Sequence, residues 1–242
     1  RLIKNATCRL MCYSTKSAAD LTAEHIALHS DGVQFDAVSG GERAHVRLGI
    51  PGAFTVYNAL GVIQAAQALG LPLEKIAAAL STAQGVKGRA EVVPTPGKDY
   101  TVLIDYSHTP DSLENILKTV RGFCRGHVIA VFGCGGDRDP FKRPIMGGIA
   151  ARLADVAVVT SDNPRTENPY AILHEILAGM ADSATPFAVL ESRREAIAYA
   201  LDHARTGDVV VLAGKGHETY QVVGAETLPL DERQVVREHL SQ

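Results

Sequence analysis

The chain has 242 residues, of which 46% are hydrophobic and 21% are charged, and its formal net charge is −3. This length predicts one or two domains with enough chain to bury a core, and the composition is typical of a globular protein. The small negative charge argues against a nucleic-acid-binding surface, and no apolar run reaches the roughly 20 residues that a membrane-spanning helix needs.

The cysteines indicate a reducing environment. Cys8, Cys12, Cys124 and Cys134 are scattered and form no Cys-x-x-Cys pair. We therefore expect reduced thiols in a cytoplasmic protein. The sequence opens at Arg1 without a signal peptide and runs at once into apparent strand residues, so we expect a fragment of a longer protein.

The first third of the sequence predicts part of a mixed α/β domain. Turn signals at Asp31-Gly32 and Gly40-Gly41 separate short extended stretches, and two helices follow on either side of Gly70-Leu71-Pro72. The expected strands cover residues 9–13, 26–29, 32–36 and 45–48, and the expected helices cover 54–69 and 73–83. We interpret residues 1–88 as the C-terminal, incomplete part of a domain.

From about residue 90 the sequence alternates regularly between strands and helices. The uninterrupted apolar run Val209–Leu212 is typical of a parallel strand covered on both faces. The expected strands cover residues 91–94, 101–105, 127–132, 155–160, 187–190, 208–213 and 220–223. Helices are expected after four of them and over residues 231–240. Residues 89–242 therefore predict a Rossmann-like, doubly wound, mostly parallel sheet whose strand order stays open.

Five of these strands end in loops rich in polar residues or glycine. The loops cover residues 105–111, 133–139, 161–167, 191–194 and 214–218. Carboxyl ends of parallel strands share one edge of the sheet, so the loops can converge on one crevice. Asp162, Arg165 and Glu167 carry both signs of charge, which favours a zwitterionic ligand over a plain anion. Lys215, His217 and Glu218 are expected to project from the last loop. Ordinary polar loops are the alternative for any one of these segments.

Several common sites are disfavoured by the motifs. Gly133–Arg138 begins like a dinucleotide fingerprint, but Arg138 replaces its third glycine, which argues against an NAD-dependent enzyme. No Gly-x-x-x-x-Gly-Lys-Ser/Thr loop occurs, so a triphosphate cradle is not in this chain. Lys142-Arg143 and Arg193-Arg194 are interpreted as solvated helix starts. For the first pair, attraction of an anion to the helix N-terminus is the alternative.

Six motifs occur in order along the chain. They are Tyr57-Asn58, Gly88-Arg89-x-Glu91, Asp105–Asp111, Gly133–Arg143, Asp162-Asn163-Pro164-Arg165-x-Glu167, and Gly214–Glu218 followed by Tyr220-Gln221. Together they resemble the motifs of the Mur ligases over nearly the whole chain. The Asp-Asn-Pro-Arg motif resembles the family members that add meso-diaminopimelate rather than lysine. Thr55 departs from the family pattern, which usually has Asn there.

The resemblance implies an ATP- and Mg²⁺-dependent ligase of peptidoglycan synthesis. Such an enzyme activates UDP-N-acetylmuramoyl-L-alanyl-D-glutamate as an acyl phosphate, which the amine of meso-diaminopimelate attacks. By this resemblance, residues 1–88 are the end of the central ATP-binding domain and residues 89–242 are the amino-acid-binding domain. The chain alone is then expected to be inactive, monomeric and free of nucleic acid and membrane. A stand-alone module that binds an amino acid or a nucleotide is the alternative.

The resemblance also implies roles for individual residues. The diaminopimelate-binding residues would be Arg138, Asp162, Asn163, Pro164, Arg165, Gly214 and Glu218. The residues that contact adenine and ribose would be Asn58, Arg89 and Asp105. His108 would lie near the phosphates as the candidate catalytic residue, and no metal ligand is assigned. Arginine can hold the ligand's carboxylates with paired hydrogen bonds, while Glu218 and the Gly214 carbonyl receive its distal ammonium.

Overall fold

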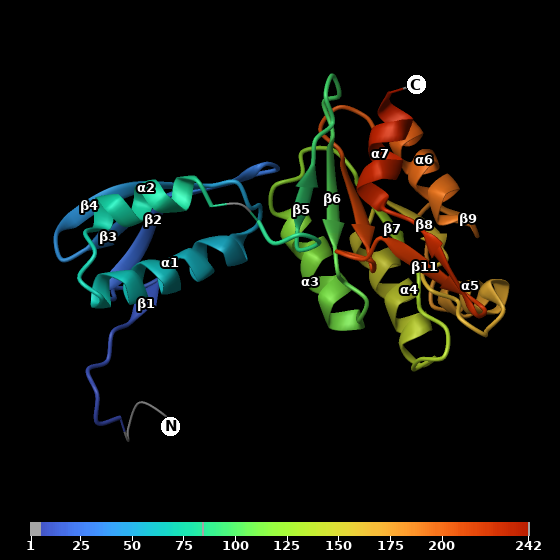
Figure 1. The fold of residues 1–242 in the computed structure, drawn as a ribbon, viewed down its shortest axis with the longest axis horizontal. Coiled ribbons are helices and arrows are strands. Elements are labelled where there is room, and N and C mark those ends of the chain that lie inside the picture. Colours follow the sequence, from blue (N-terminus) through green and yellow to red (C-terminus); the bar gives the residue numbers. More distant parts are fainter. Residues whose placement is uncertain (1–5, 84, 242) are drawn as a thin grey trace. The chain divides into compact units, whose positions relative to one another are not determined.

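The computed structural model describes residues 6–83 and 85–241 of the chain. It divides into two compact units, residues 1–84 and 85–242, each with its own sheet and its own hydrophobic core (Figure 1). Within these described ranges, no helix combines the length and the apolar character that crossing a bilayer requires.

The first unit is a four-stranded sheet with two helices. The strands lie in the order β1-β2-β3-β4, with β1 parallel to β2 and the other pairs antiparallel. The elements are β1 (Tyr13–Ser14), β2 (Leu21–His29), β3 (Gly32–Ser39), β4 (Glu42–Leu48), α1 (Ala53–Ala68) and α2 (Leu73–Ser81). Phe35 and Val46 from the sheet pack with Leu60 and Ile63 of α1, and all four are fully buried.

The strand predicted over residues 9–13 is wrong for most of its length, because only Tyr13 lies in β1. The Asp20 carboxylate accepts the Cys12 amide at 2.7 Å, and the Cys12 carbonyl accepts the Leu21 amide at 3.2 Å. A local loop therefore satisfies this backbone in place of a ladder of strand hydrogen bonds. The turns at Asp31-Gly32 and Gly40-Gly41 are confirmed between β2, β3 and β4.

The second unit is a doubly wound sheet of the predicted class. Its strands lie in the order β5-β6-β10-β7-β8-β9, and all pairs are parallel except β5 with β6. The strands are β5 (Glu91–Val93), β6 (Thr101–Asp105), β7 (Val128–Phe132), β8 (Val156–Thr160), β9 (Phe187–Leu190) and β10 (Val209–Ala213). The helices are α3 (Pro110–Arg121), α4 (Lys142–Leu153), α5 (Pro169–Ala178), α6 (Arg193–His203) and α7 (Glu232–Leu240).

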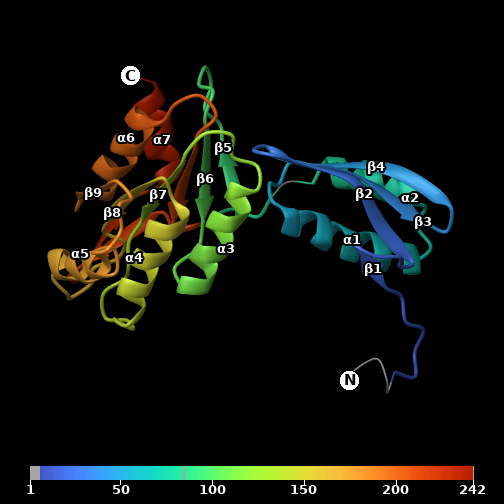
Figure 2. The same ribbon diagram turned by 180° about the vertical axis from the view of Figure 1, so that it is seen from behind.

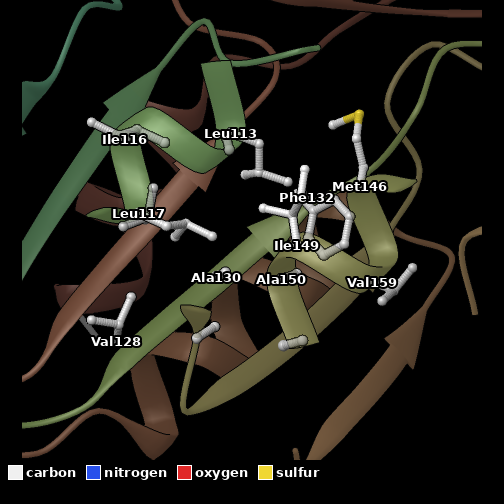
Figure 3. Packing of buried hydrophobic residues seen from close by; sticks show 14 of the residues in the cluster. Leu113, Ile116, Leu117, Val128, Ala130, Phe132, Met146, Ile149, Ala150 and Val159 are labelled. Carbon is white, nitrogen blue, oxygen red and sulfur yellow. The ribbon is translucent and has the colours of Figure 1, made fainter. Parts of the chain in front are cut away.

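Helices cover both faces of this sheet. The helices α3, α4 and α5 lie on one face, and α6 and α7 lie on the other, as the two opposite views show (Figures 1 and 2). Successive side chains of a strand point to opposite faces, so Ala130 and Phe132 of β7 meet α3 and α4 while Ile129 and Val131 meet α6. Figure 3 shows the first of these cores, in which Phe132 packs near Leu113 and Ile149.

An antiparallel hairpin follows the last parallel strand. It consists of β11 (Tyr220–Val223) and β12 (Glu226–Pro229) and turns at Gly224, which has the left-handed φ of 58°. The sequence predicts the first of these strands but not the second. All four residues of β12 are exposed, so its sequence has no buried, apolar alternation that would mark a strand.

Candidate functional site

A pocket of about 540 Å³ opens at the carboxyl ends of the parallel strands in the second unit. Its walls come from the loops that follow β6, β7, β8 and β10, as the sequence predicts for a doubly wound sheet. The residues that line it are Tyr106, His108, Thr109, Pro110, Gly135, Arg138, Asp139, Phe141, Lys142, Ile145, Asp162, Asn163, Arg165, Gly214 and Glu218. Cations and carboxylates thus share one cavity.

The loops after β7 and β8 are bound tightly to each other. The Gly136 amide donates to the Asn163 carbonyl at 2.9 Å, and Arg165 Nη1 donates to the Gly136 carbonyl at 2.8 Å. A Cβ atom at position 136 would lie 1.9 Å from the Pro164 carbonyl oxygen, so only glycine allows this approach. Pro164 is buried in this contact and does not line the pocket.

Arg143 ties the same two loops together from below. Its side chain is only 1% exposed, and it donates to Glu167 and Glu175, each at 2.8 Å. It also reaches the Gly135 carbonyl at 3.4 Å. The interpretation of Arg143 as a solvated helix start is therefore wrong, and so is the alternative of a free anion-binding cation. Lys142 does line the pocket, but its ammonium donates to the His108 carbonyl at 2.7 Å.

Glu167 ionises more readily in the folded protein than in the unfolded chain. The hydrogen bond from Arg143, followed by that from the Asp137 amide, holds the pKa of this carboxyl below its usual value against the opposing effect of burial. A group with a lowered folded pKa contributes stability above its unfolded pKa and loses it as the pH falls through the folded pKa. The connection between the two loops is therefore strongest above the usual glutamate pKa of about 4.3.

Replacing Glu167 by glutamine is expected to destabilise the second unit at neutral pH and to have less effect in acid. Denaturant unfolding at neutral pH and at about pH 3 measures this, because the wild-type carboxylate is being neutralised over that range. Glu226→Gln changes an exposed carboxyl of β12 and serves as the control. A difference between wild type and Glu167→Gln that stays constant down to pH 3 would contradict the ionic role.

Arg165 is held by the hairpin that follows β10. Its φ of 52° lies in the left-handed region, which costs energy for a residue with a side chain. The Arg165 amide donates to the Val222 carbonyl at 3.1 Å, and the Arg165 carbonyl accepts from the Gly224 amide at 2.7 Å. These bonds to β11 and to the turn that follows it offset the strain and hold the backbone of Arg165 in place. The hairpin thus supports the site without lining the pocket.

Lys215 lies beneath the pocket and is completely buried, although the sequence predicts that it projects from its loop. Its ammonium donates to Asn163 Oδ1 at 3.0 Å, and to Asp162 Oδ1 and Glu218 Oε2, both at 3.3 Å. Asn163 Nδ2 donates to the same Glu218 oxygen at 3.0 Å. Three predicted ligand-binding residues are therefore joined through one lysine that sequence reasoning left out of the site.

The environment of Arg193 differs from the one expected for the loop after β9. Its side chain is fully buried and pairs with Glu232 of α7 at 2.8 Å, so it is not a solvated helix start. It also donates to the Ala213 carbonyl at 2.9 Å and to the Ser161 carbonyl at 3.4 Å. Arg193 therefore joins the carboxyl ends of β8 and β10 beneath the pocket, and the loop of residues 191–194 contributes no lining residue.

The segment after β6 supplies another part of the pocket wall. Thr109 and Ser112 cap α3 through reciprocal side-chain hydrogen bonds, as Thr109-Pro110 predicts. The exposed His108 lines the pocket, and its Nδ1 donates to the Tyr106 carbonyl at 3.0 Å. The guanidinium of Arg89 lies 5.3 Å from the centre of the Tyr106 ring. Burial, and then the nearby Glu218 carboxylate, raises the pKa of Tyr106, so this phenol stays a hydrogen-bond donor.

The residues predicted to contact a nucleotide do not line the pocket. Asp105 is buried, and its carboxylate accepts the Ala90 amide at 2.8 Å and the Ser107 hydroxyl. Arg89 is exposed beside Tyr106. Asn58 belongs to the first unit, where it lies exposed on α1. The pocket instead gathers His108 and six of the residues predicted to bind diaminopimelate, namely Arg138, Asp162, Asn163, Arg165, Gly214 and Glu218.

Two family models match the sequence. The model of the Mur ligase glutamate ligase domain matches residues 88–216, and the model of the Mur ligase middle domain matches residues 1–66.

Curated relatives extend this similarity over the whole chain. The chain is 44% identical to the UDP-N-acetylmuramoyl-L-alanyl-D-glutamate–2,6-diaminopimelate ligase of Clostridium botulinum, and the alignment covers 100% of the chain and 50% of that protein. It is 48% identical to the ligase of the same name from Gloeobacter violaceus, over 95% of the chain and 47% of the relative. The chain thus spans about half the length of the curated relatives that it matches.

Solved structures of ligases also match the chain. A structure of a UDP-N-acetylmuramoyl-L-alanyl-D-glutamate–2,6-diaminopimelate ligase matches with a TM-score of 0.78 and 34% sequence identity, covering 96% of the chain and 47% of that protein. The UDP-N-acetylmuramate-alanine ligase of Thermotoga maritima matches with a TM-score of 0.64 over the same shares of the two chains. The sequence identity to the latter is 21%, so that likeness concerns the fold alone.

Proposed function

Because the chain belongs to the Mur ligase family, we propose that it is part of an ATP-dependent ligase that joins meso-diaminopimelate to UDP-N-acetylmuramoyl-L-alanyl-D-glutamate. In this proposal residues 89–242 bind the incoming amino acid, and residues 1–88 are the end of the ATP-binding domain. The names of the relatives that match the whole chain support this substrate pair.

The observation that carries the proposal is the distribution of charge in the pocket. Arg138 and Arg165 lie in the same cavity as the carboxylates of Asp162 and Glu218. A diamino dicarboxylic acid presents ammonium and carboxylate groups together, and such a ligand can pair with both sets of side chains. A plain anion or a plain amine would pair with only one of the two sets.

The role of the protein in the reaction is then to position the amino acid. The amine that attacks must be held near the activated carboxylate, and a pocket that fixes both ends of the amino acid supplies this orientation. Arg138 and Arg165 are proposed to hold carboxylates of the ligand, while Glu218 and the Gly214 carbonyl receive its distal ammonium. His108 lines the wall of the pocket at the start of α3 and is the proposed catalytic contact.

ATP, when bound, supplies the phosphoryl group that activates the acceptor carboxylate. We propose that Arg89, Asp105 and Asn58 contact its adenine and ribose. Arg89 and Asn58 are exposed, and each Asp105 oxygen retains a second lone pair for a hydroxyl. The described residues contain no group of three or more His, Cys, Asp or Glu side chains that could hold a metal ion. The proposal assigns no ligand of Mg²⁺ to this chain.

The proposal includes a cytoplasmic, monomeric protein with no nucleic-acid partner and no membrane insertion. The four cysteines of the described residues are free thiols, which supports a reducing compartment. The net charge of −3 supports the exclusion of nucleic acid.

Binding of meso-diaminopimelate to the 242-residue chain tests the proposal. In calorimetry we expect it to bind at least about tenfold more tightly than L-lysine, which lacks the second carboxylate and so leaves an arginine unpaired. The same chain is expected neither to hydrolyse ATP nor to ligate, because it has no Gly-x-x-x-x-Gly-Lys-Ser/Thr loop. A preference for lysine would refute the assigned ligand, and ligation by this chain would refute its role as one part of the enzyme.

A further inference from the structure

Lys215 is a buried lysine whose hydrogen bonds all go to side chains of the pocket wall, which a lysine that only stabilised the fold would not require. It is 0% exposed and does not line the pocket, yet its three hydrogen-bond acceptors all do. An ammonium has three donors, and here one goes to Asp162, one to Asn163 and one to Glu218. Lys215 therefore has no donor left for a ligand and can act on one only through these neighbours.

Lys215 donates to one oxygen of each of two carboxylates and makes no bond to the other oxygen of either. Lys215 takes Oδ1 of Asp162 and Oε2 of Glu218, and Asn163 adds a second bond to that Glu218 oxygen. Among the described residues, Asp162 Oδ2 accepts no hydrogen bond. Glu218 Oε1 accepts only a long bond of 3.4 Å, from Tyr106. One oxygen of each carboxylate is thus fixed from below, and the other stays available.

We propose that Lys215 is a positioning residue, which aims the free oxygens of Asp162 and Glu218 at the distal ammonium of the amino acid. This inference rests on the proposed function of the pocket. Two carboxylates that share a small site repel each other, and a buried cation between them offsets one of the two charges. The pair then presents a single net negative charge, which matches one ammonium group.

The Gly214 backbone contributes to the same end of the pocket. Its φ of 119° is open to glycine but strained for other residues, and a Cβ atom there would lie 3.0 Å from Asp162 Oδ2. The glycine therefore leaves free the space beside Asp162 Oδ2, which is the oxygen that Lys215 does not contact. The lysine and the glycine, which are adjacent in sequence, thus affect the two oxygens of the same carboxylate.

Lys215→Met tests this role because it removes the charge and the donors while keeping an unbranched side chain. The two ligands to compare by calorimetry are meso-diaminopimelate and L-2-aminopimelate, which keeps the distal carboxylate but lacks the distal ammonium. We expect the variant to bind meso-diaminopimelate about tenfold more weakly or worse, since misplaced acceptors forfeit charge-assisted hydrogen bonds. Binding of L-2-aminopimelate should stay within about twofold of wild type.

A second variant covers the case in which Lys215→Met does not fold. Lys215→Met combined with Asp162→Asn removes one cation and one anion together, so no additional buried charge is left unpaired. Compared with Asp162→Asn alone, it should show a further loss for meso-diaminopimelate and none for L-2-aminopimelate. Thermal unfolding of each variant without ligand reports whether the fold is retained.

The possible results separate this inference from the function on which it rests. Equal losses for both ligands would mean that Lys215 only maintains the fold, and no loss for either would mean that the carboxylates need no positioning. Each of these results overturns the role of Lys215 while the amino-acid site stands. A wild-type chain that binds neither compound overturns the site itself and the role of Lys215 with it.

Discussion

Arg165→Ala is expected to weaken the binding of meso-diaminopimelate about 100-fold, which corresponds to roughly 2.7 kcal/mol. Among the described contacts, Arg165 donates only through Nη1, to the Gly136 and Asn163 carbonyls. Its Nη2 and Nε groups remain for a carboxylate, and two parallel hydrogen bonds from one guanidinium form the strongest kind of pairing available to it. The backbone bonds to β11 already hold this arginine in place, so little further ordering is required.

Calorimetry on the 242-residue chain measures this loss. Arg194→Ala is the matched control, because Arg194 is an exposed arginine of α6 that pairs with Glu238 and does not line the pocket. Arg165→Lys should give an intermediate affinity, since lysine keeps the charge but not the planar fork. If Arg165→Ala binds meso-diaminopimelate as well as the Arg194 control does, Arg165 does not hold a carboxylate of the ligand.

Arg193→Met is expected to lower the free energy of unfolding of the second unit by about 3–5 kcal/mol. Arg193 and Glu232 are both completely buried, and Glu232 Oε2 has no hydrogen-bond partner among the described residues. Loss of the arginine leaves a carboxylate in the core without a counter-charge. It also removes the donors to the carbonyls of Ala213 and Ser161.

Denaturant unfolding followed by circular dichroism measures the effect of Arg193→Met. Arg194→Met, at the next position, removes an exposed guanidinium and should change the stability by no more than about 0.5 kcal/mol. Replacing both Arg193 and Glu232 by methionine should restore a large part of the loss, because the unpaired charge is removed. A double variant as unstable as Arg193→Met alone would show that the pair is not the source of the effect.

The sequence predicts the sheet of the second unit well because its strands have simple signals. Val209–Leu212 is apolar throughout, and such a run is typical of a strand with helices on both faces. The position of the site follows from the same signal, because polar loops after parallel strands must meet at one edge. The strand order does not follow, since β10 enters between β6 and β7 although it comes last of the parallel strands.

The buried charges could not be predicted, because each depends on a residue far along the chain. Arg193 is buried only because Glu232 packs against it 39 positions later, and Lys215 reaches Asp162 across 53 positions. In the sequence each looks like an ordinary cation at a helix start or in a loop. The roles assigned to Arg138, Arg165 and Glu218 remain predictions.

The hairpin β11–β12 has a consequence for the order in which the protein becomes functional during synthesis. Val222, which holds the backbone of Arg165, also donates to Asn163, 59 positions before it. Residues 161–167 therefore leave the ribosome well before the segment that gives them their final shape. Since β10 is also the strand that joins β6 to β7, a nascent chain that ends before it can form neither the continuous sheet nor the final shape of residues 161–167. Residues 161–167 therefore acquire their final shape late, when residues 222–224 fold onto them.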